Sequence, residues 1–239
     1  MRLKIATFNF WGLPWPFSVR RVARLRMLAD LVSRERFDIV ACQEVWLRQD
    51  IRRLRRWLPE YQLCDQCPCL FNRSGLIFLS RLPLSCGLFL PYDMPVISWE
   101  FPSKKGILRA QIVINGQPFQ IINTHVLYTP NATQTRLQKR QLDQLIDVLD
   151  NRPTFLFGDF NREFDAMHLP EHFSLISENT KPSISMTNRF AKMRLNKIGM
   201  SDRLPDYIFV NFPVRSARSY FINRPIISDH YPVVAEVDI

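Results

Sequence analysis

The sequence predicts an α/β fold with mixed strands, and three observations support this prediction. Short apolar runs typical of strands alternate along the 239 residues with segments whose apolar residues recur at helical spacing. Asn115-Gly116, the strongest short hairpin signal in the chain, joins two strand-like runs and therefore requires an antiparallel pair. Polar side chains able to do chemistry stand at the ends of successive strands. If the strands lie in two packed sheets, these ends can converge on one cleft.

The first quarter of the chain alternates strand and helix. An apolar run over 3–8 indicates a buried strand, and the run 37–41 indicates a second one. Between them, apolar residues recur at helical spacing over 22–32, with Ser18 as the expected N-cap. A short basic helix is expected at about 50–58.

The rest of the chain continues the alternation. The remaining expected strands lie at 76–79, within 84–90, and at 107–114, 119–123, 154–157, 207–210 and 233–237. The amphipathic segment 131–149 predicts a helix between the central hairpin and the strand that follows it. Because the candidate site draws on both ends of the chain, residues 1–239 are expected to form a single domain.

Polar residues at the strand ends form the candidate site. They are Asn9, Glu44, His125, Asp159, Asn161, Asp206, Asp229 and His230. Cleavage of a phosphodiester requires that charge on the phosphate is neutralised, that water is activated and that the leaving oxygen is protonated or metal-bound. This set contains carboxylates, amides and imidazoles, which together can meet all three requirements.

Metal binding is expected of the carboxylates. Glu44 and Asp229 offer the hard oxygen ligands that Mg²⁺ requires, and Mn²⁺ is the alternative ion. Asn9 and Asn161 can each supply an amide oxygen or donate to a phosphate.

Two of the four histidines, His125 and His230, stand at expected strand ends. Imidazole titrates near neutral pH, so each can act as an acid, a base or a phosphate donor. His168 and His172 belong to no motif and are expected at the surface.

Six motifs in order resemble the endonuclease/exonuclease/phosphatase superfamily, which includes pancreatic-type DNases, apurinic endonucleases, inositol polyphosphate phosphatases and neutral sphingomyelinases. They are Thr7-Phe8-Asn9-Phe10-Trp11-Gly12, Gln43-Glu44-Val45-Trp46, Asn123-Thr124-His125, Gly158-Asp159-Phe160-Asn161, Pro205-Asp206-Tyr207-Ile208-Phe209-Val210 and Ser228-Asp229-His230-Tyr231-Pro232-Val233. The resemblance implies a four-layer α/β sandwich, in which two packed mixed sheets are flanked by helices.

Within that superfamily the chain is most similar to the neutral sphingomyelinase branch. The similarity rests on Asn9-Phe10-Trp11-Gly12-Leu13-Pro14, Glu44-Val45-Trp46 and Lys105-Gly106-Ile107-Leu108. The segment around Thr187-Asn188 departs from that branch because it lacks the usual Trp-Asp after the threonine.

The resemblance also implies metal and water roles. Glu44 would be the main Mg²⁺ ligand, helped by Asn9 and Asp229. Asp159 and Asn161 would orient or activate the attacking water and bind phosphate.

The same resemblance implies roles for the imidazoles. His230 would contact the phosphate or act as base, with Asp206 fixing its orientation. His125 would act as general acid or steady the phosphate. The base and the acid stay unassigned among Asp159, His230 and His125.

Four further positions are candidates for peripheral contact, two with the substrate and two with a membrane. Lys105 is a candidate for substrate binding, and Tyr128 either lines the cleft or packs inside the fold. Trp99 and Phe101 resemble the membrane-seating aromatic hairpin of sphingomyelinases, and the alternative is an ordinary core-facing edge segment.

Three functions follow from the chemistry and the resemblance. The first is Mg²⁺-dependent cleavage of a phospholipid head group, as in a sphingomyelinase. The second is a nuclease or nucleic-acid repair phosphodiesterase, which the net charge of +10 and the arginine-rich 20–56 region favour. An equally good interpretation of the arginines in this region is that they form solvated helix faces and bind no phosphate. The third is an inactive scaffold that binds phosphorylated partners.

Five cysteines cannot all pair within one chain. The cluster Cys64, Cys67 and Cys69 is expected to be reduced, with one disulfide as the alternative under oxidising conditions and a zinc site as a weaker one. We find no signal peptide and no apolar stretch of membrane-spanning length, so the chain is expected to be soluble. Its compartment is unknown, with the cytoplasm as the default.

Overall fold

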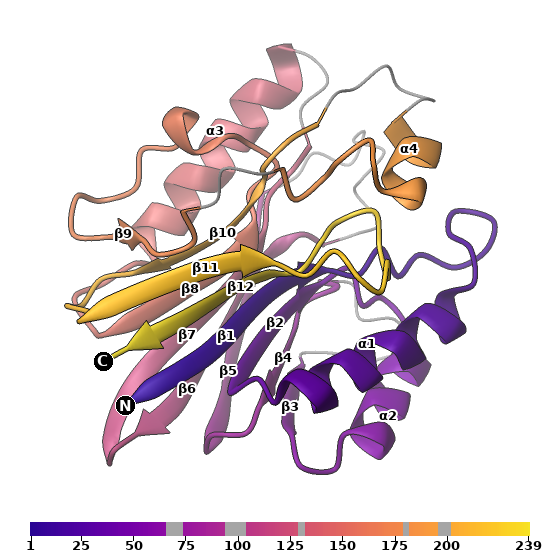
Figure 1. Ribbon diagram of the computed structural model, residues 1–239. Helices are drawn as coiled ribbons and strands as arrows, with labels where there is room; N and C mark the ends of the chain where they lie inside the picture. The colour runs from indigo at the N-terminus through magenta and orange to yellow at the C-terminus, as the bar shows by residue number, and fades with distance from the viewer. Residues whose placement is uncertain (66–73, 94–103, 129–131, 179–181, 196–201) are drawn as a thin grey trace.

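The computed structural model describes the chain except for residues 66–73, 94–103, 129–131, 179–181 and 196–201. The described strands form two sheets of six strands each, which pack face to face. Figure 1 shows α1 (Arg21–Glu35) and α2 (Arg48–Trp57) on one side of the sheets and α3 (Ala132–Asp147) on the other. This arrangement confirms the predicted α/β class and the four-layer sandwich.

The first sheet combines both ends of the chain with the early strands. Its order is β11 (Ser216–Phe221), β12 (Val233–Asp238), β1 (Arg2–Asn9), β2 (Ile39–Gln43), β4 (Ile77–Ser80) and β3 (Gln62–Asp65). β1 pairs antiparallel with β12 and parallel with β2, so the sheet is mixed, as predicted.

The second sheet comes from the middle of the chain. Its order is β5 (Leu84–Pro91), β6 (Gly106–Ile114), β7 (Gln117–His125), β8 (Thr154–Asp159), β10 (Asp206–Val210) and β9 (Ser174–Leu175). β7 and β8 run parallel, and α3 lies between them in the sequence.

The predicted central hairpin is confirmed. β6 and β7 pair antiparallel up to Ile114 and Gln117, and Asn115 and Gly116 form the connection. Both turn residues have positive φ, 50° and 78°, which asparagine and glycine tolerate better than other residues.

Three apolar layers hold the sandwich together. α1 and α2 pack on the outer face of the first sheet, and α3 packs on the outer face of the second. A third cluster fills the space between the sheets. The run Phe155-Leu156-Phe157 of β8 is apolar without alternation because both faces are covered: Phe155 and Phe157 face the other sheet, and Leu156 faces the α3 side.

The helix predictions hold apart from one cap. Ser18 does not cap α1, because the residue before the helix is Arg20, and the Ser18 hydroxyl instead donates to the carbonyl of Leu13. Two short elements, η1 (Phe164–Ala166) and α4 (Arg189–Leu195), were not predicted. Among the described residues, no helix is both long and apolar enough to cross a membrane.

The cysteine prediction is corrected. Cys64 of β3 and Cys86 of β5 form a disulfide between the two sheets, with a Cα–Cα distance of 5.2 Å, instead of remaining reduced. Cys42 is free and buried, whereas Cys67 and Cys69 lie outside the described residues. Disulfides are rare in the reducing cytosol, so this pair weighs against the cytoplasmic default.

Replacing Phe157 by alanine should lower the free energy of unfolding by about 3–5 kcal/mol, because the ring is fully buried between the sheets. The matched control is Val113→Ala on β6, whose side chain is 40% exposed. It should change stability by less than about 1 kcal/mol. Urea denaturation followed by circular dichroism measures both, and equal losses would contradict the assigned core.

Candidate active site

Three candidate residues lie side by side in the second sheet. The strand register places His125 of β7 opposite Asp159 of β8, and Asp159 opposite Asp206 of β10. Residues opposite each other in neighbouring strands project from the same face, and each of the three is at most 2% exposed. Strand pairing thus brings together side chains that lie far apart in the sequence.

Asn9 connects this row to the other sheet. From the end of β1, its amide nitrogen donates to Glu44 Oε1 at 3.0 Å and to Asp159 Oδ2 at 2.9 Å. Its amide oxygen accepts the backbone N–H of Trp11 at 2.9 Å. One amide group therefore holds a carboxylate of each sheet at the same point.

Two of the site residues have a left-handed backbone. Glu44 has a φ of 59°, and Asn161 has a φ of 51°. Asparagine adopts this conformation readily, whereas for glutamate it is uncommon and costs about 1–3 kcal/mol. Such a cost is typical of positions where the direction of a side chain matters more than local stability.

Asn161 links Asp159 to His125. Its backbone N–H donates to Asp159 Oδ1 at 2.9 Å, and its side-chain amide donates to the carbonyl of Val126 at 2.9 Å. The same amide nitrogen lies 3.3 Å from His125 Nε2, and His125 Nε2 lies 3.6 Å from Asp159 Oδ2.

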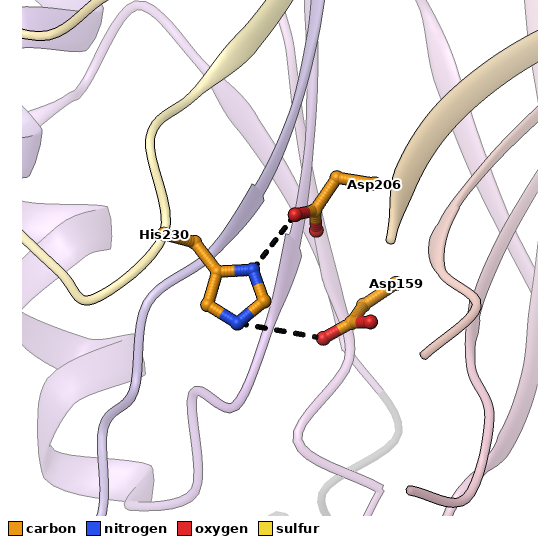
Figure 2. A group of neighbouring side chains, drawn as sticks. All are labelled: Asp159, Asp206 and His230. Carbon is orange, nitrogen blue, oxygen red and sulfur yellow. Dashed lines mark hydrogen bonds and ion pairs between the residues drawn. The ribbon is translucent and has the colours of Figure 1, made fainter. Parts of the chain in front are cut away.

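His230, from the loop before β12, approaches both Asp159 and Asp206. Figure 2 shows its ring between two carboxylates, with Nδ1 2.7 Å from Asp206 Oδ2 and Nε2 3.8 Å from Asp159 Oδ2. The Asp206 oxygen also accepts the hydroxyl of Ser183. This contact with Asp206 engages Nδ1 of the ring and leaves Nε2 facing the site.

Burial and neighbouring charges control protonation here. Burial opposes a charge on the His230 ring, but Asp206, Asp159 and Asp229 outweigh it and raise the pKa of His230 to about 9. The ring is therefore charged at neutral pH. Burial and the nearby charge of Asp206 raise the pKa of Asp159 above its usual range.

Asp229 lies in the loop that carries His230. It is 2% exposed, and its Oδ1 accepts the hydroxyl of Ser228 at 2.9 Å. Asn188, which sequence reasoning did not single out as a site residue, donates to the carbonyls of Ser228 and Asp229 at 2.8 and 3.3 Å. These bonds fix the loop that positions His230.

The residues fit a hard divalent cation. Glu44 is 6% exposed, its Oε1 accepts from Asn9, and its charge acts on the buried guanidinium of Arg24. A buried carboxylate supplies the hard oxygen ligand that Mg²⁺ prefers. A second metal-compatible cluster consists of Asp159, Asp206 and His230, whose ligand atoms lie within 4.8 Å of one another. Hydrogen bonds from His230 and Ser183 occupy Asp206 Oδ2, whereas the buried Asp206 Oδ1 has no hydrogen-bond partner among the described residues. Both Glu44 and this cluster therefore offer carboxylate oxygens to a cation.

The peripheral candidates are only partly brought to the site. Lys105 is 4% exposed, and its ammonium group donates to the carbonyl of Val126 at 3.1 Å. Its charge partly opposes the rise in the pKa of Asp159. Tyr128 is half-buried, with the guanidinium of Arg203 5.0 Å from its ring centroid. Trp99 and Phe101 lie outside the described residues.

The other two histidines have no part in the site. His168 and His172 are exposed, as predicted for surface residues.

Arg24 belongs to the arginine-rich run for which the sequence left open a phosphate-attracting surface and solvated helix faces. It is 2% exposed, and its guanidinium donates to the carbonyls of Phe10, Trp11, Val19 and Ile227 and to the hydroxyl of Ser18. Burial lowers the pKa of Arg24 to about 10, and the charges of Asp229 and Glu44 oppose that shift. A buried cation therefore ties the loop after β1 to the loop that carries Asp229 and His230.

Comparison with known proteins agrees with this geometry. The model of the Endonuclease/Exonuclease/phosphatase family matches residues 6–230. Sphingomyelin phosphodiesterase 2 of Homo sapiens is 36% identical over 85 residues, which are 35% of this chain and 20% of that protein. The chain thus matches one fifth of the length of this relative.

Solved structures share the fold. Truncated TDP2 from Caenorhabditis elegans has a TM-score of 0.77 and 16% identity over 100% of this chain and 98% of that chain. Sphingomyelinase C from Streptomyces griseocarneus has a TM-score of 0.76 and 16% identity over 100% of both chains. At this identity the likeness concerns the fold alone.

Replacing Arg24 by methionine should lower the free energy of unfolding by about 3–5 kcal/mol, because it leaves buried carbonyl groups without donors. Arg26→Met is the matched control on the same helix, where Arg26 is exposed and pairs with Asp30. It should cost about 0.5 kcal/mol or less. Urea denaturation distinguishes them, and a small effect at Arg24 would contradict its assigned role.

Proposed function

The chain belongs to the endonuclease/exonuclease/phosphatase family, and from this membership we propose that it is a Mg²⁺-dependent phosphodiesterase that cleaves a phospholipid head group, sphingomyelin first. The observation that carries the proposal is the contact of Asn9 with both Glu44 and Asp159, beside His125 and His230. The identity with sphingomyelin phosphodiesterase 2 supports the choice of lipid.

Glu44 would hold the ion, with Asn9 and Asp229 as the additional ligands expected from the resemblance. When bound, Mg²⁺ neutralises phosphate charge and polarises the bond to phosphorus. Asn9 contributes chiefly by orienting the carboxylates, since its amide nitrogen faces Glu44 and Asp159 and its oxygen accepts from Trp11.

Asp159 is our choice for the general base. Its raised pKa makes its carboxylate a better proton acceptor than an ordinary aspartate, and Asn9 and Asn161 hold both of its oxygens in place. A water molecule beside Asp159 Oδ2 would give up its proton there as it attacks phosphorus.

His230 and His125 would then act on the phosphate and the leaving group. The charged His230 ring, oriented by Asp206, presents Nε2 to a phosphate oxygen and stabilises the charge that develops on it. His125, whose Nε2 lies 3.6 Å from Asp159 Oδ2, would donate a proton to the leaving oxygen. Lys105 and Tyr128 remain candidates for substrate contact.

A nuclease is the second candidate. The net charge of +10 and the exposed arginines of α2 favour binding to a polyanion, and the TDP2 structures share the fold. The charge alone does not choose between nucleic acid and a phospholipid surface, because both present phosphates.

The purified protein should release phosphocholine from sphingomyelin vesicles in the presence of Mg²⁺, because the site provides an ion-binding carboxylate, a base and a proton donor. Coupled detection of choline measures the release. A chelator should abolish turnover, and added Mg²⁺ or Mn²⁺ should restore it. Plasmid nicking without phosphocholine release, under any of these ions, would replace the phospholipid proposal by the nuclease.

Glu44→Gln and His230→Ala should each reduce turnover by about 10²–10⁴-fold, since one removes the main metal ligand and the other the charged phosphate contact. The matched control is His168→Ala, an exposed histidine outside the site, which should keep full activity. Steady-state kinetics over a range of Mg²⁺ concentrations measure all three. Unchanged turnover in Glu44→Gln or His230→Ala would disprove the mechanism.

A further inference from the structure

Two large aromatic side chains protrude from the segment between β1 and α1. Trp15 is 85% exposed and Phe17 is 68% exposed, the highest values among the large hydrophobic residues that the structure describes. Val22, at the start of α1, is also exposed. In Figure 1 this segment projects from the edge of the molecule between α1 and α4. An exposed group of this kind marks an interaction site more often than an isolated apolar residue does.

Hydrogen bonds from its backbone and from two side chains hold the loop in this shape. The Ser18 hydroxyl donates to the carbonyl of Leu13 and closes the loop at its base, and the N–H of Phe17 donates to the carbonyl of Pro14 at 2.9 Å. Arg24 donates to Ser18 Oγ at 3.1 Å and anchors the base to the buried interior. The fold therefore presents the two aromatic rings to solvent through specific bonds.

The base of this loop is continuous with the candidate active site. Trp11 donates its N–H to Asn9, and Gly12 donates its N–H to the carbonyl of Glu44 at 2.9 Å. A Cβ atom at Gly12 would lie 2.3 Å from that carbonyl oxygen, so only glycine permits this approach. Whatever Trp15 and Phe17 contact is consequently held near Glu44.

Cationic side chains accompany the aromatic tip. Arg20 follows the loop and is exposed, and exposed Arg189 and Lys192 lie on α4. α4 is held against the loop base because the Phe190 ring lies 6.2 Å from the Trp11 ring. The combination of protruding aromatic rings with a cationic rim suits a bilayer surface, where rings enter the interface and cations meet lipid phosphates.

We propose that the loop 13–18, with Trp15 and Phe17 at its tip, docks onto a phospholipid bilayer and presents the active site to lipid head groups. The inference rests on the proposed function for its substrate, but the docking itself is independent of catalysis. A nucleic acid is a weaker fit, because aromatic platforms for single strands line a groove that follows the backbone, whereas these rings stand on a projecting tip.

The test compares vesicle binding of the wild type with that of the double variant Trp15→Ala/Phe17→Ala. Sedimentation with vesicles of phosphatidylcholine and phosphatidylserine should show binding weakened by about tenfold or more, since two large apolar groups are lost from the interface. Leu88→Ala on β5 is the matched control, because Leu88 is a 60% exposed apolar residue on an edge strand of the other sheet. It should bind as the wild type does.

A spectroscopic measurement addresses the depth of insertion directly. Brominated lipids should quench part of the tryptophan fluorescence of the wild type. In Trp15→Phe that part should disappear while vesicle binding persists, because phenylalanine keeps an aromatic ring at the tip. Equal quenching in Trp15→Phe, or equal vesicle binding in the double alanine variant, overturns the docking proposal.

Turnover of a soluble diester separates the two proposals. The double variant should hydrolyse bis(p-nitrophenyl) phosphate with Mg²⁺ at the wild-type rate, yet cleave vesicle sphingomyelin more slowly. Loop-dependent vesicle binding without hydrolysis of any phospholipid would remove the proposed substrate and leave docking intact. Absent vesicle binding, together with loop-dependent binding of a single-stranded oligonucleotide, would overturn docking in favour of nucleic acid.

Discussion

The structure of the site depends on one buried amide, the side chain of Asn9, which donates to Glu44 from its own sheet and to Asp159 of the other. Packing between the sheets is apolar over most of its area and does not by itself specify how their ends align. A hydrogen bond between the sheets does specify this alignment, because its length and direction are restricted. The bond between Asn9 and Asp159 therefore fixes the distance between the two halves of the site.

A second polar contact between the sheets reinforces this alignment. The amide of Gln43 donates to Thr7 at 3.0 Å within the first sheet and to Asn123 of the second at 2.8 Å. Asn123 in turn donates back to the carbonyls of Cys42 and Ile77. Leaving such buried groups unpaired costs about 1–3 kcal/mol each, so a shift of one sheet against the other is opposed at several points. This network thereby helps to fix the position of His125, Asp159 and Asp206 relative to the first sheet.

Much of this arrangement was predictable from local sequence. Strand and helix periodicity, the turn at Asn115-Gly116 and the polar residues at strand ends are all local features, and the structure bears them out. Asn9, Glu44 and Asp206 were identifiable because each immediately follows or begins an apolar run. The motif resemblance added the four-layer architecture, which periodicity alone did not specify.

The remainder depended on contacts that local patterns do not encode. β11 is an edge strand whose exposed residues give no apolar alternation, and β3 and β9 have only four and two residues. The Cys64–Cys86 pair joins strands of different sheets, so cysteine spacing could not reveal it. Ser183 and Asn188 act on Asp206 and on the His230 loop from a segment without strand or helix periodicity.

Arg24 shows most clearly that local sequence patterns do not reveal long-range contacts. It also explains how the loops of the site are held in place. In a run of arginines it has no local feature that distinguishes it from solvated neighbours, yet its guanidinium is the buried one. Loops have no ladder of backbone hydrogen bonds, so their carbonyls need other donors when they are buried. A guanidinium has five N–H groups in a rigid plane, which allows Arg24 to serve Phe10, Trp11 and Ile227 at once. The sheets position Asn9, Asp159 and its row, while this single cation positions the loop after Asn9 and the loop that carries His230 against them.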